Sequence, residues 1–201
     1  MIETLKTGKD IKKISRAIVG LIKHGKVLIF PTDTVYGLVA DATNKNAVQY
    51  LFKIKKRQKG KAVPIFVKDI KTAKKLAHID EKQENFLKKV WPGKLTIVLK
   101  RKKGYKIYGV DKNTIALRIP KYPLLFEIMK MVNRPLTGTS ANISGKPSST
   151  KIKQVISQFG KEKNLPDLIL DAGNLKRAKP SSIIDLTKKK LKILRRGEQI
   201  P

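Results

Sequence analysis

The sequence predicts an α/β fold made of one domain that spans residues 1–201. Short apolar runs of strand length alternate along the chain with segments whose apolar residues recur at helical spacing. A chain of 201 residues can bury one sizeable core, and no Pro-, Gly- or Ser-rich linker divides this one. These observations favour a sheet with helices packed on it.

Helices are predicted where apolar residues repeat every three or four positions. In the first, Ile14, Ile18 and Leu21 share a face, and Gly25 ends the helix. Asn44 precedes the second and is a preferred N-cap residue. The predicted helices cover residues 10–24, 45–54, 70–77, 81–90, 123–132 and 152–159.

Strands are predicted where β-branched and other apolar residues form short runs between turn residues. Because proline lacks an N–H, Pro64 predicts that the strand around it is an edge or irregular strand. The lone tryptophan, Trp91, is interpreted as a core residue. The predicted strands cover residues 27–30, 63–67, 95–99, 114–120, 168–170, 182–186 and 191–194, with a short one at Leu136.

The segment of residues 26–44, KVLIFPTDTVYGLVADATN, is predicted to be the centre of function. Its apolar run forms a buried strand that Pro31 stops, and a polar cluster follows at once, made of Thr32, Asp33, Thr34 and Tyr36. Ligands of α/β proteins gather just beyond strand ends, so this cluster is a candidate for holding a substrate. A Thr-rich turn that caps the next helix is the alternative, and this segment alone does not separate the two.

Two other segments carry cations that could meet an anion. Lys55 and Arg57 alternate as they would on one face of an extended segment, although lysine is so common here that a chance Lys-x-Arg is expected. Arg118 interrupts an apolar strand. It either reaches solvent from an edge or points into a cavity at an anionic partner, and the second is favoured.

The loop of residues 134–150, RPLTGTSANISGKPSST, is rich in small and hydroxyl residues. Small residues let backbone N–H groups approach an anion, and Ser140 and Asn142 can add side-chain hydrogen bonds. The alternative is a plain connecting loop in which Ser149 or Thr150 caps the next helix. The density of small polar residues favours a phosphate or nucleotide site.

The composition excludes several kinds of chemistry. With no cysteine and two histidines, the chain lacks material for disulfides, Cys-based zinc sites or a Ser-His-Asp triad. No apolar run approaches the roughly 20 residues of a membrane span, and the first residues, MIETLKTGKD, lack the apolar core of a secretory signal. The sequence therefore predicts a soluble, cytoplasmic protein without membrane contact.

The formal net charge of +31 permits a contact with nucleic acid, because a protein that neutralises phosphates releases their counterions. The excess is shared almost equally between the two halves of the chain, and 38 of the 46 basic residues are lysine. Compositional bias is the favoured cause of much of this charge. The eight arginines are the more informative cations, because a guanidinium is hard to replace at a phosphate or carboxylate.

Seven segments in order resemble motifs of the YrdC-like family, whose members include threonylcarbamoyl-AMP synthases. They are PTDTVYGL, KIKKR, WPGKLT, IALRIP, TGTSANISG, PSSIIDLT and ILRRGEQI, and the match runs from about Lys12 to Ile200. The resemblance implies a twisted, mostly mixed sheet with flanking helices around an open basic cavity. It implies a nucleotidyltransferase that joins L-threonine, bicarbonate or CO2, and ATP with Mg2+ into threonylcarbamoyl-AMP and pyrophosphate. A separate transferase then uses this product to modify tRNA.

The resemblance also implies roles for individual residues. Lys55 and Arg57 match the pair near the nucleotide phosphates and are the expected catalytic cations. Thr32 and Arg118 match residues that meet threonine, the second through its carboxylate. The expected ATP-binding residues are Lys55, Arg57, Thr114, Ser140, Asn142, Ser148 and Arg195, the expected threonine-binding residues are Thr32, Arg118, Gly138 and Ser181, and no protein side chain is expected on the metal.

The sequence departs from the family pattern at Gln58, at residues 61–63, and at Phe66, where some relatives have a histidine. We expect no counterpart of the extra C-terminal domain of longer relatives, so another segment or partner must close the cavity. Two other functions stay open. One is a related carbamoyl-adenylate-forming enzyme with another substrate, and the other is a non-enzymatic protein that binds tRNA or other double-stranded RNA.

Overall fold

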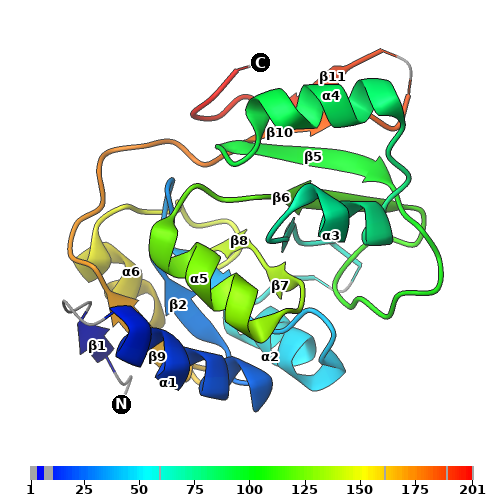
Figure 1. Cartoon of the computed structure of the whole chain (residues 1–201). Coiled ribbons are helices and arrows are strands. Elements are labelled where there is room, and N and C mark those ends of the chain that lie inside the picture. Colours follow the sequence, from blue (N-terminus) through cyan, green and yellow to red (C-terminus); the bar gives the residue numbers. More distant parts are fainter. Residues whose placement is uncertain (1–3, 7–10, 59, 161, 189, 201) are drawn as a thin grey trace.

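The computed structural model describes residues 4–6, 11–58, 60–160, 162–188 and 190–200, whose strands form two mixed sheets (Figure 1). The predicted α/β class is confirmed. Sheet A has the order β1 (Thr4–Lys6), β9 (Leu168–Asp171), β2 (Leu28–Phe30), β3 (Gly37–Val39) and β8 (Thr139–Ser140). Sheet B has the order β11 (Lys192–Arg195), β10 (Ser182–Asp185), β5 (Leu95–Lys100), β6 (Thr114–Arg118), β4 (Ile65–Phe66) and β7 (Leu136–Thr137).

Six helices accompany these strands in the part of the chain that the structure describes. The side chain of Asn44 accepts a hydrogen bond from the backbone N–H of Ala47, so the predicted N-cap of the second helix is confirmed. Asp10, predicted to begin the first helix, lies outside the described residues. None of the described helices is long and apolar enough to cross a membrane. The helices are α1 (Ile11–Lys23), α2 (Lys45–Lys55), α3 (Ile70–Leu76), α4 (Glu81–Val90), α5 (Pro123–Val132) and α6 (Ile152–Phe159), and each matches a predicted helix.

Sheet A is buried on both faces. Side chains alternate between the two faces of a strand. Around β2, Leu28 and Phe30 pack with α1 and α5, whereas Val27 and Ile29 pack with α2 and α6. Figure 1 shows α1 and α5 side by side over one face of this sheet. Burial of both faces explains why four consecutive apolar residues occur here.

The central strands of sheet B pack one of their faces against α3 and α4. Ile97 of β5 and Leu117 of β6 lie in the core with side chains of α3 and α4. The neighbouring residues on the same strands, Val98, Ala116 and Arg118, line a pocket instead. Because adjacent residues of a strand point to opposite faces, β5 and β6 have one face in this core and the other against the pocket, whereas Phe66 of β4 and Leu136 of β7 pack with α1 and α5.

The two sheets meet where β7 continues into β8 through a single residue, Gly138. β7 pairs with β4 of sheet B, and β8 pairs with β3 of sheet A. Thr137 strengthens the junction, since its N–H donates to the carbonyl of Ala40 (2.9 Å) and its hydroxyl accepts from the N–H of Ala40 (2.8 Å). A seam of hydrogen bonds around residues 136–140 therefore holds the sheets together.

Some strands differ from the predictions. β1, β3 and β8 were not predicted, because runs of two or three residues carry no readable alternation. β4 lies between β6 and β7, so the strand next to Pro64 is short and internal, and the predicted edge position is wrong. The missing N–H of Pro64 does not disrupt the pairing there, because Pro64 contributes its carbonyl, which accepts from the N–H of Gly138 (2.8 Å).

The structure also excludes one local interpretation and two alternatives that the sequence left open. The Thr-rich turn after β2 leads into β3, so it caps no helix. Lys55 is the last residue of α2, and Lys56 takes a left-handed conformation (φ 49°, ψ 39°), so Lys55 and Arg57 do not alternate on an extended segment. The N-cap of α6 is Lys151, without a side-chain hydrogen bond, so neither Ser149 nor Thr150 caps it.

The seam yields a stability prediction. A Cβ on Gly138 would clash with the ring of Phe66, so we expect Gly138→Ala to lower the free energy of unfolding by about 1–3 kcal/mol through overpacking. Gly20→Ala in α1 is the matched control, because nothing lies within 4 Å of its Cβ, and it should stabilise the protein by about 0.5–1 kcal/mol. Urea unfolding measures both, and a Gly138→Ala midpoint at or above that of the wild type would contradict the prediction.

Candidate active site

A pocket of about 680 Å³ lies against the face of sheet B that carries Val98 and Ala116. Its other walls are the turn after β2, the segment that follows α2 and the loop that begins at Gly138. The structure thus brings together segments that are far apart in the sequence. Nine of the eleven predicted site residues line the pocket, namely Thr32, Lys55, Arg57, Arg118, Gly138, Ser140, Asn142, Ser181 and Arg195.

Two residues expected at ATP, Thr114 and Ser148, are not among those that line this pocket. Thr114 begins β6, where its hydroxyl donates to the carboxylate of Asp111 (3.0 Å), and it lines a separate hollow beside Lys100. Ser148 is half-buried in the loop before α6. The geometry therefore gives no support to their expected roles.

The turn after β2 is held by its own hydroxyl groups. The hydroxyl of Thr32 donates to the carbonyl of Val35 (2.7 Å) and accepts from the N–H of Thr34 (3.1 Å). Since its one proton is used inside the turn, the Thr32 hydroxyl can only accept from a ligand in this conformation. The hydroxyl of Thr34 lies 3.1 Å from that of Thr32 and accepts from Nη1 of Arg118 (3.3 Å). The turn is therefore connected directly to the arginine of β6.

Arg118 is 3% exposed and forms an internal ion pair. Its Nε donates to the carbonyl of Gly93 (2.9 Å), and its Nη2 donates to the carboxylate of Asp33 (2.6 Å). The guanidinium carbon lies 5.8 Å from the centre of the Phe66 ring. Burial lowers the pKa of Arg118, and the Asp33 carboxylate opposes that shift. Of the two interpretations of this arginine, a side chain that reaches solvent from an edge is wrong.

Lys55 is 3% exposed and holds the loop that follows β8. Its ammonium donates to the carbonyls of Ser140 (2.6 Å) and Asn142 (3.0 Å) and to the side-chain oxygen of Asn142 (2.8 Å). The hydroxyl of Ser140 donates to the same side-chain oxygen (2.6 Å). Burial, and to a smaller extent the charge of Arg57, lowers the pKa of Lys55 to about 7. Lys55 thus fixes the predicted Ser-x-Asn pair relative to α2.

The two remaining arginines of the pocket are held by carbonyl groups. Arg57 donates from Nε to the carbonyl of Lys61 (2.8 Å) and from Nη2 to that of Ala62 (2.6 Å). Arg195 donates from Nε and Nη2 to the carbonyl of Ser181 (3.1 and 2.6 Å). Burial lowers the pKa of both guanidinium groups. Because carbonyl oxygens carry no net charge, both arginines keep a positive charge for a ligand.

The electrostatics of the pocket are therefore uneven. Among the described residues, Arg118 has a carboxylate partner, whereas the bonds recorded for Lys55, Arg57 and Arg195 run to neutral oxygens. An anion that enters beside Arg57 and Arg195 meets positive charge without a counter-ion, and its own charge would favour the protonated form of Lys55. This arrangement suits a ligand with several negative charges.

Sequence reasoning placed Asp33 in a polar cluster that could hold a substrate, but it did not predict the contact of Asp33 with Arg118. One oxygen of Asp33 meets Arg118, and the other accepts from the backbone N–H of Lys121 (3.0 Å). The pair is 85 positions apart, and no sequence pattern connects residues of two different sheets. Lys61 and Ser144 also line the pocket and were not predicted.

The fold and the pocket together define a class of α/β proteins with two mixed sheets and a cation-lined pocket. The chain belongs to the Sua5/YciO/YrdC family, whose model, described as telomere recombination, matches residues 20–197.

Curated relatives carry a common name. A protein of Pyrococcus abyssi named threonylcarbamoyl-AMP synthase is 36% identical over 185 residues, which cover 90% of this chain and 53% of the relative. A Methanocaldococcus jannaschii protein provisionally given the same name is 37% identical over 189 residues, which cover 94% and 88%. The chain thus spans about half of the first relative and most of the second.

Solved structures agree with the family assignment. The crystal structure of Pyrococcus abyssi Sua5 complexed with L-threonine matches with a TM-score of 0.85 and 34% sequence identity, covering 98% of this chain and 57% of that one. Escherichia coli YciO matches with a TM-score of 0.84 over 98% and 96% of the two chains. At 24% identity, the second likeness concerns the fold alone.

The buried ammonium of Lys55 yields a prediction about pH. Its pKa of about 7 in the folded protein lies below the ordinary value of 10.5, so between these values the unfolded chain binds a proton that the folded chain does not. The free energy of unfolding of the wild type should therefore rise with pH relative to Lys55→Met across this window, by up to about 1.4 kcal/mol per pH unit. Urea unfolding of both proteins from pH 6 to pH 10 measures the difference. A difference that stays flat would mean that the three acceptor oxygens keep the ammonium charged.

Proposed function

We propose that this protein is an L-threonylcarbamoyladenylate synthase, a nucleotidyltransferase that forms threonylcarbamoyl-AMP and pyrophosphate from L-threonine, bicarbonate or CO2, and ATP. The observation that carries the proposal is the gathering of nine residues, assigned to ATP or threonine from the sequence, around one pocket. The names of the curated relatives and the L-threonine in the Pyrococcus structure support the choice of substrates.

The chemistry explains why cations dominate the pocket. A carbamate formed from the threonine amine attacks the α-phosphorus of ATP, a new P–O bond forms, and pyrophosphate leaves with the electrons of the broken P–O bond. An anion must approach a polyanion, so repulsion is the main obstacle. Catalysis then depends on alignment and charge neutralisation, and no protein nucleophile is needed.

The residues of the pocket fit these tasks. Arg57 and Arg195 have neutral acceptors and can neutralise the triphosphate and the departing pyrophosphate. Lys55 keeps Ser140 and Asn142 in place and adds positive charge when it is protonated. Arg118 binds the carboxylate of threonine through N–H groups that Asp33 leaves free.

A magnesium ion belongs to the proposal as a companion of ATP. In the chain as described, no group of three or more His, Asp or Glu side chains is placed to hold a metal ion. The phosphate oxygens of ATP and water are suitable Mg2+ ligands, since this ion usually keeps several waters and binds few protein groups. The ion would neutralise part of the phosphate charge alongside the two arginines.

The product would be consumed by another enzyme. Threonylcarbamoyl-AMP is a reactive mixed anhydride, and we propose that a separate tRNA threonylcarbamoyl transferase receives it in the cytoplasm. A direct contact of this chain with tRNA belongs to the same proposal, because the excess of lysine would favour it.

The proposed reaction has a direct test. Purified protein incubated with ATP, Mg2+, bicarbonate and labelled threonine should yield labelled threonylcarbamoyl-AMP and one equivalent of pyrophosphate. Reactions without threonine, with serine, or with carbamoyl phosphate in place of bicarbonate are the controls. Release of pyrophosphate only with carbamoyl phosphate would assign the related carbamoyl-adenylate activity. No nucleotide product, together with tight tRNA binding at physiological salt, would assign the RNA-binding function.

Arg57 provides a test of the charge argument. Arg57→Ala should lower the turnover number about a hundredfold, roughly 3 kcal/mol, because it removes a cation beside the phosphates. Arg177→Ala is the control, since Arg177 is exposed and is not among the residues that line the pocket. Pyrophosphate release at saturating substrate measures both variants, and melting curves show that they fold. Unchanged turnover in Arg57→Ala would remove the proposed role of this residue.

A further inference from the structure

The described protein groups use only part of the hydrogen-bonding capacity of Arg118. A guanidinium carries five N–H groups. One on Nε, one on Nη2 and one on Nη1 already donate, to Gly93, Asp33 and Thr34. In the part of the chain that the structure describes, one N–H on each terminal nitrogen has no partner, and Arg118 lines the pocket. The direction in which these two groups point depends on the three contacts that hold the side chain.

Asp33 makes the strongest of these contacts and is itself fixed. Its side chain is 8% exposed and that of Arg118 is 4% exposed, so the ion pair is shielded from water. One oxygen of Asp33 takes the guanidinium at 2.6 Å, and the other is held by the N–H of Lys121 at 3.0 Å. The carboxylate therefore links the turn after β2 to the chain that leaves β6. Asp33 is not among the residues that line the pocket, so it acts on a ligand there through Arg118.

We propose that Asp33 is a positioning residue for the amino-acid substrate: its carboxylate holds the buried guanidinium of Arg118 so that the two remaining N–H groups bind the substrate carboxylate. This inference rests on the proposed function and adds to it the residue that orients the carboxylate site. A charge-assisted hydrogen bond depends strongly on direction, so an arginine that is free to rotate would bind the carboxylate less well.

The charge of Asp33 also fits the kind of ligand. The Asp33–Arg118 pair has no net charge, and an α-amino acid is a zwitterion without net charge. A neutral pair can bind such a ligand through directed hydrogen bonds, whereas an unpaired arginine would favour any small anion that reaches it. Asp33 therefore restricts this end of the pocket to ligands that can satisfy two fixed N–H groups.

The experiment compares Asp33→Asn with the wild type. Asparagine keeps the shape and an oxygen for Lys121 but cannot hold the guanidinium by charge. We expect the KM for threonine to rise by about tenfold or more, with the KM for ATP within about twofold of the wild type. Asp167→Asn is the matched control, because Asp167 also joins a cation, Lys26 (3.1 Å), and a backbone N–H, that of Val27 (2.8 Å), at a place that does not line the pocket.

The same substitution made in an Arg118 variant distinguishes a positioning role of Asp33 from a general loss of stability. In Arg118→Gln, which itself binds threonine weakly, adding Asp33→Asn should change the KM for threonine no further, because Asp33 acts through Arg118. If Asp33→Asn shows no melting transition, Asp33→Glu replaces it in the experiment. Asp33→Glu should raise the KM for threonine several-fold and leave the turnover number unchanged.

Three outcomes would overturn the proposal. These are an unchanged KM for threonine in a folded Asp33→Asn, a lower KM, which would make Asp33 a competitor of the substrate, and equal effects of Asp33→Asn with and without Arg118. Failure of the proposed function looks different, since the wild type would then release no threonine-dependent pyrophosphate.

Discussion

The structure depends on a constraint at Gly138, where the chain passes from sheet B to sheet A within one residue. No side chain fits there, because the ring of Phe66 occupies the space that a Cβ would need. The backbone of this seam is fully used: Pro64 and Ala40 accept from the N–H groups of Gly138 and Thr137. Since the seam fixes the angle between the sheets, it also fixes the distance between Arg118 on β6 and the turn after β2. Three residues of the seam, Gly138, Thr139 and Ser140, also line the pocket.

The arginines of the pocket are of two kinds, which differ in the charge of the groups that hold them. Arg57 and Arg195 are held in position by carbonyl oxygens, which orient a guanidinium without cancelling its charge. Arg118 is held by a carboxylate, which both orients and neutralises it. A triphosphate gains from the first arrangement, because it brings several negative charges to uncompensated cations. A zwitterionic amino acid gains more from the second, because direction matters more than net charge for such a ligand. One pocket then offers each of the two proposed substrates the kind of cation that suits its charge.

The sequence predicted the helices well because their signal is local. Residues 81–90 and 123–132 have an apolar face that must pack, and the structure has helices with these bounds. The short strands β1, β3 and β8 were not predicted, since two or three residues show no periodicity and owe their conformation to the strands beside them. Nine site residues were predicted because the family resemblance preserves their order. The Asp33–Arg118 pair was not, because contact between distant segments is a property of the fold.

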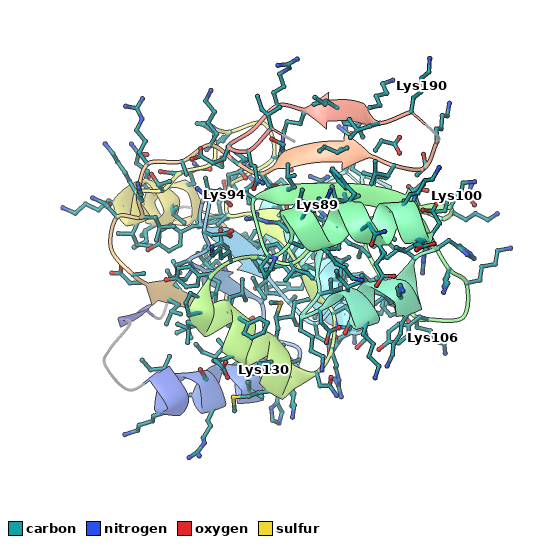
Figure 2. The ribbon with its side chains drawn as sticks, turned by 45° about the horizontal axis from the view of Figure 1, so that its top comes forward. Lys89, Lys94, Lys100, Lys106, Lys130 and Lys190 are labelled. Atoms are coloured by element: carbon teal, nitrogen blue, oxygen red, sulfur yellow. The ribbon has the colours of Figure 1, made fainter. Side chains whose placement is uncertain are left out.

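The distribution of lysine argues against deriving function from net charge. Figure 2 shows Lys89, Lys94, Lys100, Lys106, Lys130 and Lys190 on helices, strands and loops of different parts of the molecule. Such a spread raises the attraction for any polyanion but selects none, since specific recognition needs fixed donors. The pocket works in the opposite way, because each of Lys55, Arg57, Arg118 and Arg195 is tied to named protein oxygens. A fixed cation loses little entropy when a ligand binds and keeps its direction as charge shifts during a reaction. The four restrained cations therefore indicate the function of this protein more specifically than the excess of lysine does.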